Sequence, residues 1–384
     1  MKEIYLDHAA TTYCYPEVAE LVCKLMLEDY GNPSSMHRKG VDAEKYMKKA
    51  QSQLAKALGV QEKEIYFTSG GTESNNWALA GVASANKRSG THIITSAIEH
   101  AAVSAPLNWL EKQGFTITRL PVDREGRIST EALEEAITDE TILLSVMAVN
   151  NEIGTIEPLA EIGRILKKKN PKALFHVDAI QAFGKIPMQP KGLGIDLLSA
   201  SGHKIHGPKG VGFLYIRDNV KIHPLIFGGG QQKNMRSGTD NVSGAAGMGL
   251  AAELVTKALT SNMTKMQLKR KMLTDGLKEM ENVVIHGDPE SGAPHIVNAS
   301  FLGVRSEVLL HSLEDRGIFV SAGSACSSHK RAGSATLTAI GCSKQEMESA
   351  VRFSFCETTS EEDIRDTLKV LKELIPMLRR FTRK

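Results

Sequence analysis

The sequence has few cysteines, five in 384 residues, and no two of them are spaced as Cys-x-x-Cys. An odd, scattered set of thiols is not a disulfide framework, and it lacks the ligand spacing of a zinc site. We therefore expect no metal site and a reducing, cytoplasmic location. No apolar run approaches the roughly 20 residues of a membrane-spanning helix, and the N-terminus lacks the basic start and apolar stretch of a secretory signal.

An excess of charge of one sign is also missing, because the formal net charge is only +3. A balance this even does not indicate a nucleic-acid surface, and we expect neither a direct nucleic-acid partner nor a membrane partner. Internal repeats and low-complexity segments are absent too. What remains, with 41% hydrophobic and 24% charged residues, is typical of a globular enzyme. The length exceeds what one core usually supports, so two domains are expected.

Short apolar strands alternate with helical patterns in the middle of the chain. This alternation predicts an α/β fold with a mostly parallel sheet covered on both faces. Apolar residues at three-to-four spacing predict a helix over 35–58, with Gly59 placed to stop it, and a second helix beginning near Pro158. The predicted strands are 93–96, 116–120, 143–149, 174–178, 197–200 and 211–215.

After about residue 258 the pattern changes to that of a smaller α+β domain. The elements predicted there are helices over 263–280 and 306–315, strands over 283–285, 295–301 and 318–321, and a last helix that opens with a capping box in Thr359-Ser360-Glu361-Glu362. We therefore predict a large domain over 15–258 and a small domain formed by 1–14 together with 259–384.

Two of the predicted parallel strands lead into residues that suit one cofactor. One strand ends in Asp178, and the next is followed closely by Lys204. Neighbouring parallel strands deliver both side chains to the same edge of the sheet. Pyridoxal 5'-phosphate (PLP) needs a lysine to hold it and a carboxylate at its ring nitrogen. Taken singly, Asp178 is more often a turn cap and Lys204 a surface residue, but together they favour PLP.

A glycine-rich turn offers a place for the phosphate group of PLP. Gly70 and Gly71 follow a predicted strand and Thr72 opens a helix, so backbone amides and a hydroxyl can face an anion there. The alternative is an ordinary capped helix after a tight turn. His100 lies where another strand gives way to a helix. It can either cap that helix or stack on the cofactor ring and move protons.

Three further polar residues are candidates for contacts with the ring or the substrate. Asn151 follows the strand 143–149, and Gln181 lies shortly after Asp178, so both amides can reach a ring oxygen or a substrate carboxylate. Arg352 is a single charge in an apolar strand, and such a residue is usually paired. A substrate carboxylate and a structural salt bridge both stay open as its partner.

Cys326 lies in a segment of serine, glycine and alanine over about 321–335. Nothing in this segment is bulky enough to bury the thiol, so we expect an exposed, mobile loop. The basic residues at 329–331 favour the thiolate, which is the nucleophilic form. An incidental surface cysteine is the alternative. The other cysteines, Cys14, Cys23, Cys342 and Cys356, lie in helical or apolar contexts and are expected to be packing residues.

In this order, these residues resemble the cysteine desulfurases of the NifS/IscS type, within the aminotransferase class V family of PLP enzymes. The resemblance covers nearly the whole chain. It runs from Tyr5-Leu6-Asp7-His8-Ala9-Ala10-Thr11-Thr12 through Gly31-Asn32-Pro33-Ser34-Ser35 to Arg352-Phe353-Ser354. It implies the PLP-dependent transferase fold of type I, with a seven-stranded sheet in the large domain and the cysteine loop in the small one.

The resemblance also implies a role for each candidate residue. By it, Lys204 carries PLP, Asp178 pairs with the ring nitrogen, and His100 stacks on the ring. The phosphate is held by Gly71, Thr72, Ser201 and His203, the ring oxygen and substrate region by Gln181 and Asn151, and the substrate carboxylate by Arg352. Thr239 reaches the phosphate of the other subunit, which implies a homodimer. Cys326 matches the nucleophile of the relatives that have an extended mobile loop.

Three segments depart from the family's usual pattern. Cys14-Tyr15 stands where a proline-containing turn is common, Asn170-Pro171-Lys172 lengthens the approach to the Asp178 strand, and Phe355-Cys356-Glu357 replaces a segment that usually carries glycine and a basic residue. None of them belongs to the expected cofactor set. Cys356 is close in sequence to Arg352, so a modulating thiol stays open there.

The implied reaction converts L-cysteine to L-alanine and leaves the sulfur on Cys326 as a persulfide. The sulfur would then pass to an acceptor protein, such as an iron–sulfur scaffold or a thiolation protein. Two alternatives stay open. One is another class V activity, such as that of a selenocysteine lyase or an aminotransferase, and the other is a non-catalytic docking role.

Overall fold

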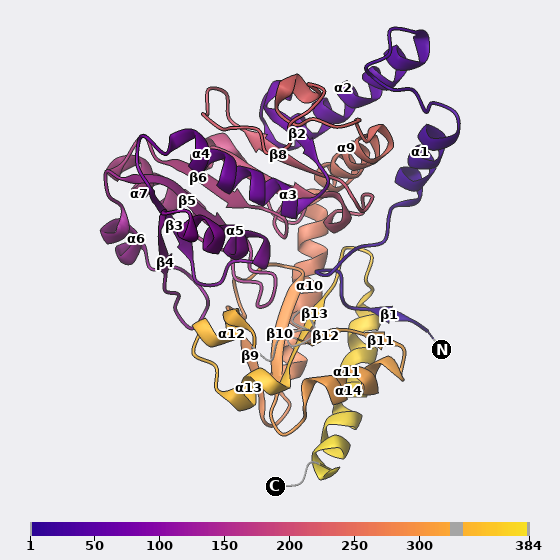
Figure 1. The fold of residues 1–384 in the computed structure, drawn as a ribbon. Coiled ribbons are helices and arrows are strands. Elements are labelled where there is room, and N and C mark those ends of the chain that lie inside the picture. Colours follow the sequence, from indigo (N-terminus) through magenta and orange to yellow (C-terminus); the bar gives the residue numbers. More distant parts are fainter. Residues whose placement is uncertain (1, 323–332, 382–384) are drawn as a thin grey trace.

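The computed structural model describes residues 2–322 and 333–381. Within these ranges, a large sheet is covered by helices, and a smaller sheet with its own helices lies below it (Figure 1). The N-terminal strand β1 (Ile4–Tyr5) lies among the C-terminal elements rather than beside the large sheet. No helix in the described ranges is both long and apolar enough to cross a bilayer.

The large sheet has seven strands in the order β2-β8-β7-β6-β5-β3-β4. The five strands from β7 to β4 run parallel, and β8 is antiparallel to both of its neighbours. The predicted α/β fold with a mostly parallel seven-stranded sheet is therefore confirmed. The strands are β2 (Ile65–Thr68), β3 (His92–Ser96), β4 (Thr116–Leu120), β5 (Thr141–Met147), β6 (Leu174–Asp178), β7 (Leu197–Ser201) and β8 (Gly212–Ile216).

The alternation of side chains along β8 explains why helices must cover both faces of this sheet. Phe213 and Tyr215 belong to one apolar core, whereas Leu214 and Ile216 belong to another. Successive side chains of a strand point to opposite faces, so a strand that is apolar throughout is stable only if both faces are covered. The surrounding helices are α1 (Pro16–Leu27), α2 (Arg38–Leu58), α3 (Gly71–Asn76), the π-helical turn η2 (Trp77–Gly81), α4 (Val82–Asn86), α5 (Ala101–Lys112), α6 (Thr130–Ala136), α7 (Leu159–Lys169), α8 (Pro190–Leu193) and α9 (Val242–Lys257).

The predicted helix ends agree closely with the structure. The helix expected over 35–58 is α2, which begins at Arg38 with His37 as its N-cap. Gly59 ends this helix in the left-handed conformation, with φ of 66°, which other residues adopt at a cost. The helix expected near Pro158 is α7, with that proline as its N-cap. Short 3-10 turns are η1 (Glu62–Glu64), η3 (Gly202–Lys204) and η4 (Gln232–Asn234).

The smaller sheet is antiparallel, in the order β12-β13-β10-β9, and β1 pairs in parallel with β11. Its core includes Leu6, Phe301, Phe353 and Leu371, and every buried member of this core lies before residue 15 or after residue 258. The domain boundaries themselves stay a prediction. The elements are β9 (Val283–His286), β10 (Ile296–Phe301), β11 (Ile318–Phe319), β12 (Ser321–Ala322), β13 (Ala350–Ser354), α10 (Leu259–Lys278), α11 (Ser306–Glu314), α12 (Ala335–Ala339), α13 (Lys344–Ser349) and α14 (Glu361–Phe381).

Two predictions of local structure were wrong in detail. The strand expected over 318–321 is divided at Val320 into β11 and β12, because the two pieces pair with different partners. The capping box of the last helix is formed by Ser360 with Asp363. It therefore begins one residue later than the predicted box, which ran from Thr359 to Glu362. The acidic partner must lie three positions after the cap to reach its backbone N–H, and Asp363 occupies that position.

Two carboxyl groups are buried near the carboxyl end of β5. Burial raises the pKa of Glu99 and of Glu157 to about 8 in each case. Glu99 accepts hydrogen bonds from the Ser96 hydroxyl at 2.6 Å and from the backbone N–H of Met147 at 2.9 Å. Glu157 accepts a single bond, from the backbone N–H of Ile128 at 3.2 Å, and its other carboxyl oxygen has no partner in the described residues.

We predict that Glu157→Gln stabilises the protein progressively as the pH rises. The folded-state pKa of Glu157 lies above its unfolded value, so the parent protein loses stability between about pH 4.5 and about pH 8, whereas glutamine does not titrate. The variant should gain about 3 kcal/mol in unfolding free energy relative to the parent between about pH 5 and about pH 8. Urea unfolding at both values measures this. The exposed Glu161→Gln is the control, and a pH-independent difference would contradict the prediction.

Candidate active site

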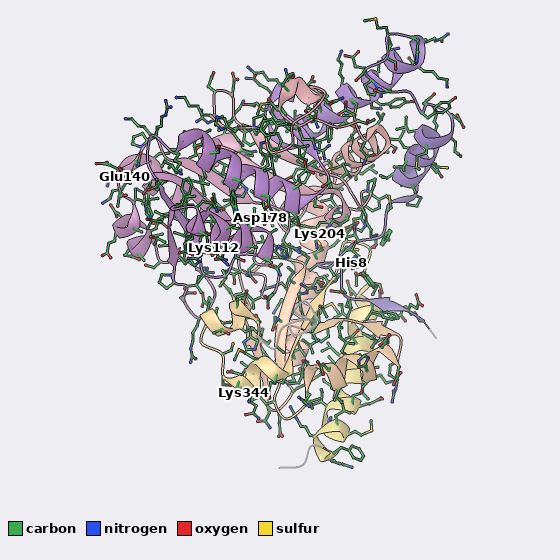
Figure 2. The ribbon with its side chains drawn as sticks, viewed as in Figure 1. His8, Lys112, Glu140, Asp178, Lys204 and Lys344 are labelled. Carbon is green, nitrogen blue, oxygen red and sulfur yellow. The ribbon has the colours of Figure 1, made fainter. Side chains whose placement is uncertain are left out.

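A cavity of about 320 Å³ opens at the carboxyl ends of the central parallel strands. It brings together residues from β6, from the turn after β7, from the start of α3 and from the N-terminal segment before Thr11. Figure 2 shows Lys204 between Asp178 of the large sheet and His8 of that segment. Ten of the predicted site residues line it: Gly71, Thr72, His100, Asn151, Asp178, Gln181, Ser201, His203, Lys204 and Arg352.

The amine of Lys204 is held by the N-terminal segment. Its Nζ donates to the carbonyl oxygens of Ala9 at 2.6 Å and Ala10 at 2.7 Å. Gln181 donates from Nε2 to the same Ala9 oxygen at 2.9 Å. The segment is fixed in turn because Thr12 donates from its backbone N–H to the carbonyl oxygen of His203 at 2.9 Å. The lysine therefore lies where three parts of the chain meet.

Asp178 is a buried carboxylate at the end of β6, 4% exposed. It accepts a hydrogen bond at 2.7 Å from the side-chain amide of Asn75 and one at 3.0 Å from the backbone N–H of Ile180. Burial raises the pKa of Asp178, and these two bonds, with the charge of Lys204, oppose the rise. A cationic partner in the cavity would stabilise the ionised form further.

The glycine turn and the end of β7 form the other side of the cavity. A side chain at Gly71 would displace Ile180, because a Cβ there would lie 2.1 Å from the Cδ1 and 2.8 Å from the Cγ1 of that residue. Thr72 is the second residue of α3, whose first turn faces Ser201 and His203. Burial, together with the charges of Lys204 and Lys209, lowers the pKa of His203 to about 4, so this imidazole is neutral at physiological pH.

His100 combines both of the roles considered for it. As the N-cap of α5, it accepts a hydrogen bond at Nδ1 from the backbone N–H of Ala102 at 3.1 Å. The ring also lines the cavity. Capping fixes the orientation of the imidazole, because only Nε2 is left for another partner. The structure thus places the ring at the cavity in a defined tautomer and leaves the predicted stacking as a proposal.

Arg352 has an internal salt bridge, which is one of the two partners expected for it. Its Nη2 lies 2.8 Å from the Oδ1 of Asp7, and its Nη1 donates at 2.8 Å to the carbonyl oxygen of Asn151. The Nε is buried without a hydrogen-bond partner in the described residues. These two bonds use two of the five N–H donors of the guanidinium, and because Arg352 lines the cavity, it can still receive a carboxylate.

Two residues of this site escaped the sequence analysis, namely Asn75 and Asp7. Asn75 lies on the helix after the glycine turn, and a second asparagine beside it hid which of the two faces inward. Asp7 precedes His8 in a segment with no helix or strand pattern, although it belongs to the motif that carries the family resemblance. Both act through contacts between segments far apart in sequence, which a pattern along the chain does not reveal.

The groups in the cavity fit PLP. A lysine amine, a buried carboxylate whose two hydrogen-bond donors are uncharged, and a glycine turn at a helix start match the aldehyde, the ring nitrogen and the phosphate in chemistry. Lys204 would hold the cofactor and Asp178 would face its ring nitrogen. Gly71, Thr72, Ser201 and His203 would surround its phosphate.

Two predicted site residues are not part of this cavity. Thr239 is exposed on the segment before α9 and does not line the cavity, and its assignment to another subunit's site stays a prediction. Cys326 lies outside the described residues. Among the remaining cysteines, Cys356 is buried and Cys14 and Cys342 are half-buried, but Cys23 is exposed on α1, so the packing role expected for Cys23 is wrong.

Known proteins resemble this chain over nearly its whole length. The aminotransferase class-V family matches residues 4–366. "Cysteine desulfurase IscS" of Methanosarcina thermophila is 45% identical over 382 residues, which are 99% of this chain and 94% of that protein. A solved structure described as "NIFS-LIKE PROTEIN" has a TM-score of 0.93 at 40% identity and covers 98% of this chain and 100% of its own. Another, "SspA in complex with cysteine", has a TM-score of 0.81 at 33% identity and covers 93% and 100%.

We predict that Asp7 positions the guanidinium of Arg352 for a substrate carboxylate. Asp7→Asn keeps the shape of the side chain but removes the charge that orients Nη2. The KM for L-cysteine should rise about tenfold while kcat changes little, because the loss falls on binding. Steady-state kinetics with L-cysteine measures both constants. Asp29→Asn, which removes the half-buried partner of Lys24, is the control. A fall in KM would mean that Asp7 competes with the substrate instead.

Proposed function

The chain belongs to the aminotransferase class-V family, as a cysteine desulfurase of the NifS/IscS type, and on that premise we propose how its own residues carry out the reaction. The observation that carries the proposal is a single cavity lined by Lys204, Asp178, His100 and Arg352. An amine, a buried carboxylate, an oriented imidazole and a guanidinium are what PLP chemistry on an amino acid requires.

Lys204 is proposed as the residue that carries PLP and that moves the proton at the substrate's α-carbon. Its amine already lies between two carbonyl oxygens, which accept hydrogen bonds from it and which keep it at the cavity. When bound, PLP supplies an electron-withdrawing ring that stabilises negative charge on the substrate and weakens its carbon–sulfur bond. Asp178 would keep the ring nitrogen protonated, and this role would explain why a carboxylate is buried there.

The remaining cavity residues bind and orient. Arg352, held by Asp7 and by the Asn151 carbonyl, receives the carboxylate of L-cysteine. His100 would stack on the cofactor ring, and Gln181 and Asn151 would face the ring oxygen and the substrate. Gly71, Thr72, Ser201 and His203 would contact the phosphate. A neutral His203 can donate one hydrogen bond to an anion without adding charge to the site.

Cys326 is proposed as the sulfur acceptor. Its thiolate attacks the sulfur of the bound substrate, so a carbon–sulfur bond breaks while a sulfur–sulfur bond forms. The products are L-alanine and a persulfide on Cys326, and the proton of the thiol ends on the alanine carbon. Atoms and electrons balance without an added oxidant or reductant. In this step the nucleophile must reach the substrate and afterwards meet an acceptor.

The partners and the location of the enzyme follow as further parts of the proposal. Thr239 is exposed in this chain and would complete the phosphate site of a second subunit, which makes a homodimer the working unit. The sulfur would pass to an acceptor protein such as an iron–sulfur scaffold. Thiols that have to stay reduced between turnovers suit the cytoplasm.

Cys326→Ala tests the assignment of the sulfur acceptor. The variant should bind PLP with an unchanged absorption spectrum but release no sulfide from L-cysteine in the presence of a reductant, with a loss of at least about 100-fold. Sulfide release and alanine formation are both measured. The exposed Cys23→Ala is the matched control and should retain full activity.

Turnover of the Cys326→Ala variant, and of the parent protein on other substrates, separates the alternative class V activities. If Cys326→Ala keeps full turnover of L-cysteine, the assignment of this thiol is wrong. If the parent protein turns over selenocysteine or transfers the amino group of alanine to a keto acid much faster than it releases sulfur from cysteine, the substrate assignment is wrong.

A further inference from the structure

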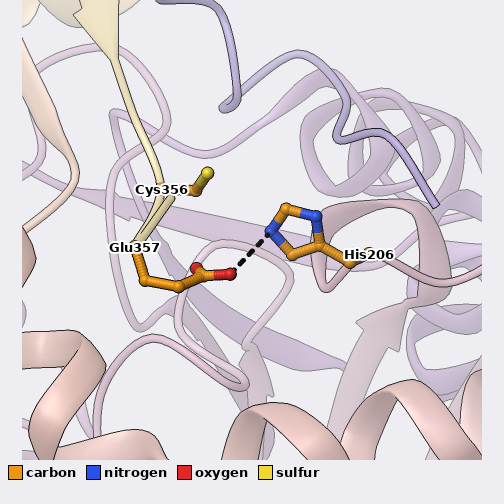
Figure 3. Close-up of side chains that lie close together, drawn as sticks. All are labelled: His206, Cys356 and Glu357. Atoms are coloured by element: carbon orange, nitrogen blue, oxygen red, sulfur yellow. Dashed lines mark ion pairs between the residues drawn. The ribbon is translucent and has the colours of Figure 1, made fainter. Parts of the chain in front are cut away.

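A second cluster of buried polar side chains lies next to the candidate active site but does not line its cavity. It consists of His206, in the loop just after Lys204, with Cys356 and Glu357, which follow β13. One ligand atom from each, a ring nitrogen, a sulfur and a carboxylate oxygen, lie within 4.8 Å of one another. Figure 3 shows the carboxylate directed at the imidazole, with the thiol beside them. The reaction proposed above uses none of these groups.

The imidazole of His206 is oriented so that its Nε2 faces the cluster. Its Nδ1 lies 3.0 Å from the carbonyl oxygen of Tyr13, which can only accept, so Nδ1 carries the proton. Its Nε2 is directed at Glu357, with the Oε1 of that residue 3.6 Å away. This ring nitrogen is fully buried and has no hydrogen-bond partner in the described residues. A buried polar atom without a hydrogen bond costs free energy, so a further partner is expected at this point.

The backbone and ring contacts of His206 hold it rigidly. Its φ is 62°, a left-handed conformation that costs a non-glycine residue free energy. The ring stacks on Tyr15 at 4.3 Å with the planes 9° apart. The hydroxyl of Tyr15 donates to Glu357, so one side chain orients both the imidazole and the carboxylate. Ligand side chains that are oriented by such outer contacts are a usual feature of metal sites.

The thiol and the carboxylate are also held in place by their neighbours. The Sγ of Cys356 lies 3.0 Å from the Oγ1 of Thr358 and 3.5 Å from the Nε2 of His8. Lys185 and Lys269 are near enough to act on the charges of Cys356 and Glu357. Lys269 fixes the backbone by donating to the carbonyl oxygens of both residues.

We propose that His206, Cys356 and Glu357 form a binding site for one thiophilic divalent ion, of which Zn²⁺ is the type. Ligand atoms around tetrahedral zinc lie about 3.3 to 3.6 Å apart. Here the Nε2 of His206 is 3.6 Å from the Oε1 of Glu357. The thiol proton leaves as the sulfur–metal bond forms, and no electron transfer is needed.

The charges around the cluster select the kind of ion. Lys185 and Lys269 offset the negative charges of the thiolate and the carboxylate, so charge alone does not hold a cation here. Affinity must come from the bonds to sulfur and to the imidazole, which favour Zn²⁺ or Co²⁺ over Mg²⁺ or Ca²⁺. Of the three ligands, Glu357 is the one that is partly exposed, so the carboxylate lies on the solvent side of the cluster.

Such an ion would connect the two parts of the protein. His206 follows the candidate cofactor lysine in the large-sheet half, whereas Cys356 and Glu357 extend the strand of Arg352 in the smaller sheet. Two segments that depart from the family's usual pattern, Cys14-Tyr15 and Phe355-Cys356-Glu357, meet at this cluster although they are more than 300 positions apart. The ion would therefore fasten the lysine loop to the substrate-binding strand.

The test uses the PLP-loaded protein in the Cys326→Ala background, which removes the thiol that lies outside the described residues. After dialysis against Zn²⁺ and then against metal-free buffer, this protein should retain about one Zn²⁺ per chain by elemental mass spectrometry. Co²⁺ should give the ligand-field absorption bands of a tetrahedral thiolate site, at wavelengths longer than the cofactor absorbs. Zn²⁺ should also raise the thermal unfolding midpoint.

Two variants in the Cys326→Ala background show which residues bind the ion. Cys356→Ala should lower the affinity for Zn²⁺ about 100-fold and abolish the Co²⁺ bands, and the near-isosteric Glu357→Gln should weaken binding about tenfold. Circular dichroism and retained PLP absorbance show that each variant folds. Cys342→Ala is the matched control, since its thiol lies 3.4 Å from His286 and leaves the cluster intact.

Four results would overturn the proposal. They are no retention of Zn²⁺ by the Cys326→Ala protein, equal retention by the Cys356→Ala variant, loss of Zn²⁺ in the Cys342→Ala control, and displacement of Zn²⁺ by Mg²⁺ or Ca²⁺. None of these readouts depends on desulfurase activity, so failure here leaves the proposed function untouched.

Discussion

The parallel pairing of β6 with β7 is the constraint on which the rest of the structure depends. Asp178 pairs with Ser199 in register, and β7 then ends two residues later in the short turn that carries Lys204. A slip of one residue would turn every side chain of a strand to the opposite face of the sheet. Both strands are apolar and buried between two cores, so such a slip is strongly disfavoured. The separation of the carboxylate from the amine is thereby set by backbone hydrogen bonds rather than by flexible side chains.

Much of the sheet and much of the site could be predicted from the sequence, for one physical reason. Asp178 and Lys204 stand at the ends of apolar runs, and the carboxyl ends of parallel strands meet at one edge. What could not be predicted depends on contacts between remote segments. Asn75 donates to Asp178 from helix α3, and Asp7 contacts Arg352 across 345 positions. The spacing of the cysteines along the chain also gave no sign of the cluster at Cys356. That thiol lies near His206 only because the fold brings the two segments together.

The N-terminal segment emerges as the element that joins the two sheets. Its carbonyl oxygens receive the amine of Lys204, Asp7 holds Arg352, and Tyr15 contacts Glu357. Its strand β1 belongs to the smaller sheet's core, while Thr12 is bonded to the loop after β7. Movement of the small-sheet half relative to the large sheet would therefore change the contacts of Lys204, of Arg352 and of the cluster around Cys356. This arrangement explains why residues at both ends of the chain contribute to one cavity.

The central claim is that Lys204 is the amine that carries the cofactor. The most direct measurement is borohydride treatment of the PLP-loaded protein, which makes the attachment permanent, followed by proteolysis and mass spectrometry of the labelled peptide. The account predicts that the pyridoxyl label is found on Lys204 alone. A label on Lys185 or Lys209, the nearby lysines of the same half of the protein, would contradict it.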